Sequence, residues 1–118
     1  MKIAVVGSRS FNDYDYMTSI LNNIEDITLI VSGGASGADR LVEMYADQNN
    51  INKLILKADW GKYGKSAGMI RNKDIVDTAE YIIAFWDGVS KGTKHMIDIA
   101  NRKGIKVYVH HTKTSDSK

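Results

Sequence analysis

The most informative part of this sequence is a glycine-rich stretch, Ser32-Gly33-Gly34-Ala35-Ser36-Gly37-Ala38-Asp39. It follows a short apolar run, Thr28-Leu29-Ile30-Val31, and it precedes apolar residues at helical spacing, beginning with Ala38, Leu41 and Val42. The sequence therefore predicts a strand, a turn with three glycines and a helix, in that order. Glycines let the backbone of such a turn approach a ligand closely. The N–H groups at the start of the helix favour an anion, and phosphate is the expected one.

The same alternation of strand and helix continues along the chain. Near-continuous apolar runs predict strands over residues 2–6, 28–31, 53–57, 80–86 and 106–109. Strands of this kind, with helices between them, are typical of a parallel sheet that is covered on both faces. We therefore predict a three-layer Rossmann-like α/β fold with five parallel strands. The order 3-2-1-4-5 is favoured, with 2-1-3-4-5 as the alternative. In either case a ligand is expected beyond the carboxyl ends of the strands, near the point where the strand order reverses.

Length and composition narrow the class of protein. The 118 residues are 43% hydrophobic, which suits one domain of ordinary size. We expect that domain over residues 1–109, followed by a polar, flexible tail over residues 110–118. The chain has no cysteine, so it has no disulfide framework and no thiolate metal site.

The expected location is the cytoplasm. No run approaches the ~18 apolar residues of a membrane span, and the first strand follows Met1 too soon for a signal peptide. Neither a metal nor a cofactor is predicted. A net charge of +2 is too small to argue by itself for a nucleic-acid partner.

Two well-known nucleotide-binding motifs do not fit this sequence. Gly64-Lys65-Ser66 resembles the end of a P-loop, but the first glycine of that motif would fall at Asp59. The motif would also follow the third strand instead of the first. The glycine turn over residues 33–37 lacks the spacing of the dinucleotide fingerprint, and the next strand ends at Lys57 instead of at an acidic residue. An NTPase and a dehydrogenase are therefore disfavoured.

Four turns, taken together, resemble the turns of one superfamily. In chain order they are Val6-Gly7-Ser8-Arg9, the stretch 32–39, Ala67-Gly68-Met69-Ile70-Arg71-Asn72 and Trp86-Asp87-Gly88-Val89-Ser90-Lys91-Gly92-Thr93. This set resembles the SLOG superfamily, the Rossmann-like group that contains the Smf/DprA DNA-processing proteins and the LOG cytokinin-activating hydrolases. The small single-domain YspA/YpsA-related branch is the most similar. The resemblance covers residues 2–109 and implies a nucleotide or nucleotide-derived ligand held by these turns.

The side chains in the four turns suit such a ligand. Arg9 and Arg71 offer planar guanidinium forks for phosphate, and Arg71 shares a predicted helical face with Ile70, so we expect it to face a cleft. Trp86 is a candidate for stacking on a base and Asp39 for bonding a ribose hydroxyl. Their competing interpretations are core packing and a favourable charge at a helix start. The candidate ligand-binding residues are Gly7, Ser8, Arg9, Gly33, Gly34, Ala35, Ser36, Gly37, Asp39, Gly68, Arg71, Asn72, Trp86, Asp87, Gly88, Ser90, Gly92 and Thr93.

One departure from the LOG pattern bears on catalysis. The LOG hydrolases split nucleoside monophosphates, and their pattern places a glutamate three residues after the threonine of the last turn. This chain has Met96 there, and cleavage of a glycosidic bond needs a carboxylate. Asp39, Asp59 or Asp87 could take over that role, but nothing in the sequence selects one of them.

Three functions therefore remain open. The first is a domain that binds a nucleotide derivative as a sensor, carrier or sequestering protein. The second is a nucleotide-processing hydrolase or transferase of LOG type with altered catalytic residues. The third, least favoured, is single-stranded DNA binding like that of Smf/DprA. The sequence leaves open the identity of the ligand, whether it is hydrolysed, and whether the chain forms a homo-oligomer.

Overall fold

The apolar runs of the sequence form one parallel sheet of five strands in the order β3-β2-β1-β4-β5. The computed structural model describes residues 1–112. The strands are β1 (Lys2–Gly7), β2 (Leu29–Ser32), β3 (Asn52–Ile55), β4 (Tyr81–Trp86) and β5 (Lys106–His111). This Rossmann-like arrangement confirms the favoured strand order, and the alternative 2-1-3-4-5 is wrong.

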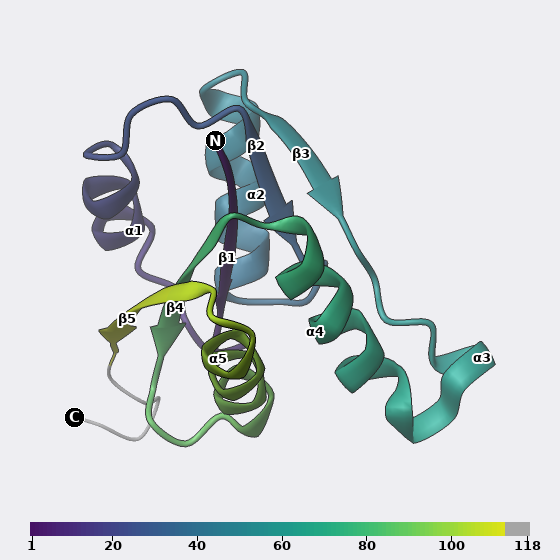
Figure 1. The fold of residues 1–118 in the computed structure, drawn as a ribbon. Coiled ribbons are helices and arrows are strands. Elements are labelled where there is room, and N and C mark those ends of the chain that lie inside the picture. The colour runs from purple at the N-terminus through teal and green to yellow at the C-terminus, as the bar shows by residue number, and fades with distance from the viewer. Residues whose placement is uncertain (113–118) are drawn as a thin grey trace.

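Helices cover both faces of the sheet (Figure 1). The helices are α1 (Tyr14–Leu21), α2 (Ala38–Gln48), α3 (Trp60–Tyr63), α4 (Ala67–Thr78) and α5 (Lys91–Lys103), with a short 3-10 turn over Gly64–Ser66. Helix α3 and the 3-10 turn follow β3, over a stretch that contains two glycines and two aromatic residues. They lie to one side of the sheet, just before α4 (Figure 1).

Alternate residues of the central strand belong to two separate cores. Ile3 and Val5 of β1 pack in one core with residues of α1 and α2, while Ala4 and Val6 pack in the other with residues of α4 and α5. This alternation follows from the period of two along a strand. Because both faces are covered, the strand is apolar from Ile3 to Val6, and burying each valine or isoleucine side chain stabilises the fold by roughly 1.5–3 kcal/mol.

Strand β5 is longer than the sequence predicted. It runs to His111 instead of ending at Val109, because His110 pairs with Phe85 in the register of the parallel ladder. The ring of His110 stacks on that of Phe85, with 5.5 Å between the centroids, and its Nδ1 lies 3.3 Å from the hydroxyl of Tyr16. The first two residues of the expected tail thus belong to the sheet, and the part of that tail over residues 113–118 lies outside the described residues.

Gly37 fixes how α2 meets the sheet. It is the residue just before the helix, and its φ is +72°. A Cβ at this position would lie 2.4 Å from the carbonyl oxygens of both Ser8 and Arg9. Only glycine combines that φ with that closeness, so the turn after β2 is held directly against the turn after β1.

Candidate functional site

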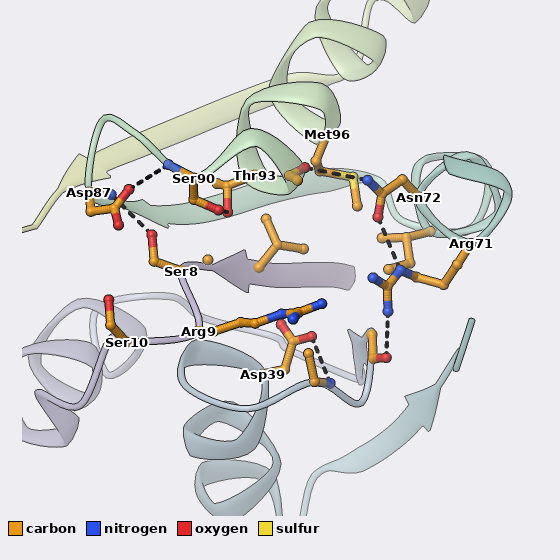
Figure 2. Close-up of a pocket in the computed structure, with 16 residues that line it drawn as sticks. Ser8, Arg9, Ser10, Asp39, Arg71, Asn72, Asp87, Ser90, Thr93 and Met96 are labelled. Atoms are coloured by element: carbon orange, nitrogen blue, oxygen red, sulfur yellow. Dashed lines mark hydrogen bonds between the residues drawn. The ribbon is translucent and has the colours of Figure 1, made fainter. Parts of the chain in front are cut away.

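A cleft of about 390 Å³ lies at the carboxyl ends of β1, β2 and β4 (Figure 2). This is the place where the strand order reverses, between β1 and β4, and where ligands bind in open α/β sheets. The volume falls in the range of small-molecule sites, about 300–1,000 Å³. The lining residues are Val6, Gly7, Ser8, Arg9, Ser10, Gly33, Ala35, Asp39, Arg71, Asn72, Ile75, Asp87, Ser90, Gly92, Thr93 and Met96.

Ser8 joins three of the four turns. Its backbone N–H donates to the carbonyl of Phe85 at 3.0 Å, its carbonyl accepts from the N–H of Ala38 at 3.3 Å, and its hydroxyl oxygen accepts from the N–H of Asp87 at 3.1 Å. Its side chain is buried. Ser8 therefore has a structural role in holding the walls of the cleft together, whatever it contributes to a ligand.

Arg71 points into the cleft (Figure 2), whereas Ile70, which was expected on the same helical face, lines a different hollow. Its Nη1 donates to the carbonyl of Gly33 at 2.6 Å, and its Nε donates to Oδ1 of Asn72 at 3.0 Å. Gly33 leaves the space that this contact needs, because a Cβ there would lie 2.5 Å from Nη1. The guanidinium group has five N–H donors, and the bonds found within residues 1–112 use two of them.

Asn72 connects Arg71 to the start of α5. Its Nδ2 donates to the carbonyl of Gly92 at 3.4 Å and lies 3.0 Å from Nδ1 of His95. The orientation of the arginine is thus tied to the last of the four turns as well as to the second. Arg9 also points into the cleft, from the end of β1 (Figure 2).

The two carboxylates of the cleft have different surroundings. Asp39 is only 6% exposed, and burial raises its pKa to about 6, although the N–H of Ala35, at 3.1 Å, and the charge of Arg71 oppose this shift. Burial also acts to raise the pKa of Asp87, but hydrogen bonds from the N–H groups of Val89 and Ser90, at 2.9 and 2.8 Å, hold it below its usual value. Asp87 therefore stabilises its own turn, whereas Asp39 is the carboxyl group of this cleft whose pKa is raised.

Several donors of the predicted phosphate cradle already have partners in the protein. The N–H of Gly34 donates to Oγ of Ser32 at 3.3 Å, that of Ala35 donates to Asp39, and that of Ala38 donates to the carbonyl of Ser8. These three N–H groups could bind a phosphate only if they first gave up their hydrogen bonds to Ser32, Asp39 and Ser8. The site as it stands therefore offers an anion chiefly the side chains of Arg9 and Arg71.

The start of α5 forms the wall of the cleft that lies across from Arg9 and Asp39 (Figure 2). Ser90, the residue before the helix, and Thr93 in its first turn lie with their hydroxyl oxygens 3.2 Å apart. Both line the cleft together with Gly92. A helix start that opens into a cleft favours an anion or the oxygens of a polar ligand.

Six of the predicted residues do not line this cleft. The indole N–H of Trp86 donates to the carbonyl of Ser90 at 3.0 Å, so Trp86 anchors a turn, and the geometry gives no support to its stacking on a base. Gly34 and Ser36 line a second, neighbouring hollow. The remaining three are Gly37, which holds two turns together, Gly68, which lies against Trp60, and Gly88, which has a positive φ.

The structure also adds lining residues that sequence reasoning missed. Ser10 follows Arg9 in the first turn, and Ile75 lies one helical turn after Arg71. The sequence contains a signal for both. Ser10 has a hydroxyl group next to Arg9, and Ile75 lies four residues after Arg71, which places it on the same side of the helix.

A metal site and a membrane-spanning helix find no basis in the described residues. Within residues 1–112, no three His, Asp or Glu side chains gather closely enough to hold a metal ion. In the same part of the chain, no helix is both long and apolar enough to cross a membrane.

Comparison with known proteins places the chain in a family. Residues 1–63 match YAcAr, the YspA, cpYpsA-related SLOG family. The Gene 61 protein of Mycobacterium phage D29 is 32% identical over 116 residues, a match that covers 90% of this chain and 93% of that protein. DNA processing protein A (DprA) from Streptococcus pneumoniae has a similar fold, with a TM-score of 0.80 at 21% identity over 98% of this chain and 52% of that one. The chain thus spans about half the length of the DprA chain. It belongs to the YspA, cpYpsA-related SLOG family.

Proposed function

We propose that the protein binds a nucleotide or nucleotide-derived small molecule in the cleft, and that it acts as a sensor, carrier or sequestering domain. The observation that carries this proposal is Arg71, held by Gly33 and Asn72 so that it points into a cleft that Arg9 also enters. Two arginines at the point where the strand order of a parallel sheet reverses are well suited to bind a phosphate group. SLOG membership and the DprA-like fold support a nucleotide- or DNA-related function.

In the proposed mode of binding, the charged and the uncharged polar groups of the ligand contact different side chains of the cleft. Arg9 and Arg71 bind phosphate oxygens by charge-assisted hydrogen bonds. The hydroxyls of Ser90 and Thr93 and the carboxyl group of Asp39 bond polar groups of a ligand that extends past the two arginines into the cleft.

Met96 argues against hydrolysis in the manner of the LOG enzymes. It lies on α5 one turn after Thr93, lines the cleft and is 2% exposed. A methionine accepts no proton and cannot stabilise a developing positive charge as a carboxylate does. We therefore expect binding without release of the base.

A nucleotide-processing enzyme is the second candidate, and one observation favours it. Asp39 lines the cleft with a pKa raised to about 6 by burial, and a carboxyl group of this kind is suited to general acid–base catalysis near neutral pH. Of the three carboxylates that could replace the missing glutamate, Asp59 does not line the cleft and Asp87 is held by its own turn. Asp39 is therefore the candidate catalytic residue of this alternative.

One experiment separates the two candidates. A panel of nucleoside monophosphates is incubated with the protein and analysed by chromatography, while binding of the same panel is measured by calorimetry. The proposal predicts saturable binding of at least one nucleotide without release of free base. Release of free base by the wild-type protein that is lost in Asp39→Asn would support the enzyme instead. The absence of binding and of turnover across the whole panel would contradict both.

A further inference from the structure

A second hollow, also of about 390 Å³, adjoins the cleft and shares Arg9, Gly33, Ala35 and Arg71 with it. Its other walls are formed by the turn after β2, by Lys57 just beyond β3, and by Trp60 at the start of α3. Because the two arginines line both spaces, a ligand bound to them can extend into either one. The ligand site therefore has two parts with a positively charged junction.

The charges of the second hollow differ from those of the cleft. Arg9, Lys57 and Arg71 line it, and among the described residues no acidic side chain does. The cleft, in contrast, contains Asp39 and Asp87. A negatively charged group is therefore favoured at the junction and in the second hollow.

Trp60 gives this hollow an aromatic wall. Its side chain is 55% exposed, which is unusual for so large an apolar ring. One part of the ring lies against Gly68 of α4, where a Cβ would be 3.4 Å from the indole Cη2. The ring is thus backed by protein at one place and borders the hollow at another. An exposed aromatic ring beside cations is the arrangement that binds bases by stacking and their phosphates by charge.

We propose that Trp60 forms the base subsite of this protein, with the base of the ligand stacked on its indole ring and a phosphate of the same ligand bound by Arg9, Lys57 and Arg71. This inference rests on the proposed function and adds to it the position of the base. It transfers to Trp60 the stacking role that the sequence suggested for Trp86, whose indole N–H is bonded to Ser90.

The test compares Trp60→Ala, Trp60→Phe and the matched control Tyr63→Ala. Tyr63 lies in the same short helix and is 41% exposed, but it does not line the hollow. Calorimetry is carried out with adenosine, guanosine, cytidine and uridine monophosphates, and with ribose 5-phosphate, which lacks a base. Thermal unfolding confirms that each variant is folded.

The expected results follow from the energy of stacking. Removing an aromatic ring from under a base costs about 1–3 kcal/mol, so Trp60→Ala should weaken nucleotide binding about 5- to 150-fold. Binding of ribose 5-phosphate should stay within about twofold, Trp60→Phe should keep most of the affinity, and Tyr63→Ala should match the wild type. Nucleotide binding should also quench the tryptophan fluorescence of the wild type and not that of Trp60→Phe.

Three results would overturn the base subsite, and the first two leave the proposed function standing. If Trp60→Ala binds nucleotides like the wild type while Arg71→Ala does not, the cleft binds the ligand and the base lies elsewhere. If Trp60→Ala weakens nucleotides and ribose 5-phosphate equally, Trp60 acts on the shape of the site and not on the base. If the wild type binds none of these compounds but binds oligothymidylate, both proposals fail in favour of single-stranded DNA.

Discussion

At the scale of single residues, Arg71 has the most direct connection to the proposed ligand. It is half-buried, it is oriented by Gly33 and Asn72, and it lines both parts of the site. A side chain that is already oriented loses little freedom on binding, which favours affinity.

Arg71→Ala should therefore weaken binding of nucleotides by about 1.5–3 kcal/mol, the range for a hydrogen bond to a charged group, or roughly 10- to 150-fold. Calorimetry with the nucleotide that binds best to the wild type measures this change. Arg40→Ala is the matched control, because Arg40 is an exposed arginine outside both parts of the site. Equal affinities of Arg71→Ala and Arg40→Ala would show that Arg71 does not contact the ligand.

The raised pKa of Asp39 predicts how the free energy of unfolding changes with pH. Its pKa in the folded protein, about 6, lies above the ordinary 3.8, so the folded state binds a proton more tightly than the unfolded state. The stabilisation from this proton is fully present below pH ~4 and is lost as the pH rises through about 6, a loss of about 2–3 kcal/mol by pH 7.

Asp39→Asn removes this titration. The free energy of unfolding of the variant, minus that of the wild type, should therefore increase between pH 4 and pH 7 by about 2–3 kcal/mol. Urea unfolding at several pH values measures it, and the subtraction removes the opposite contributions of Asp77, Asp87 and Asp98, whose pKa values are lowered. A difference that stays constant with pH would mean that Asp39 titrates like an ordinary surface carboxylate.

At the scale of elements, the site depends on how closely the turn after β2 approaches α4. Gly33 makes this approach possible, since a Cβ would meet Nη1 of Arg71 at 2.5 Å and Oδ2 of Asp39 at 2.9 Å. Both neighbours are the ends of side chains, so a methyl group there would displace them without moving the backbone.

Gly33→Ala should consequently lower nucleotide affinity about tenfold or more, through loss of the position of Arg71, while the protein remains folded. Gly61→Ala is the control, because a Cβ at Gly61 meets its nearest neighbour only at 3.7 Å, an ordinary contact. Calorimetry and thermal unfolding of both variants provide the comparison. Retained affinity in Gly33→Ala would show that the contact between Gly33 and Arg71 is not needed for binding.

The elements themselves were largely predictable from the sequence, for a physical reason. A strand that is buried on both faces must be apolar along its length, so β1 and β4 appear as continuous runs such as Ile3-Ala4-Val5-Val6. Helices α2 and α5 also have regular apolar faces and glycines at their ends, at Gly37 and Gly104.

The features that the sequence did not show depend on contacts between distant segments. The extension of β5 to His111 depends on pairing with β4 and on the ring of Phe85. Likewise, Trp60 and Trp86 both lie near polar turns in the sequence. Only the fold shows that Trp60 borders a hollow, while the indole N–H of Trp86 donates to the carbonyl of Ser90. Arg71 was expected to face the cleft and does, but Ile70, which was assigned to the same helical face, lines a different hollow, and the residue of α4 that lines the cleft one turn after Arg71 is Ile75.

At the scale of the whole molecule, the distribution of charge distinguishes a small ligand from DNA. The net charge is only +2, and the cleft is lined by two arginines and two carboxylates. Binding of single-stranded DNA releases counterions, so the logarithm of the affinity falls with the logarithm of the salt concentration by about 0.7 per neutralised phosphate.

We expect nucleotide binding to show a shallow slope of about 1–2, corresponding to the few phosphate contacts that Arg9, Lys57 and Arg71 can make. Affinities measured across salt concentrations, for the preferred nucleotide and for oligothymidylate, provide the test. A steep slope with oligothymidylate, together with tighter binding than any nucleotide, would favour the DNA-binding alternative.

A titration of the isotope-labelled protein with nucleotides, followed by NMR of the backbone amides, locates the binding site directly. We expect a nucleotide-type ligand to bind at the carboxyl ends of β1, β2 and β4. The largest shifts should fall on three of the four turns, at Arg9, Gly33, Ala35, Gly92 and Thr93, and Arg71→Ala should greatly reduce them. Shifts confined to other surfaces, or no shifts at any ligand concentration that can be reached, would contradict this expectation.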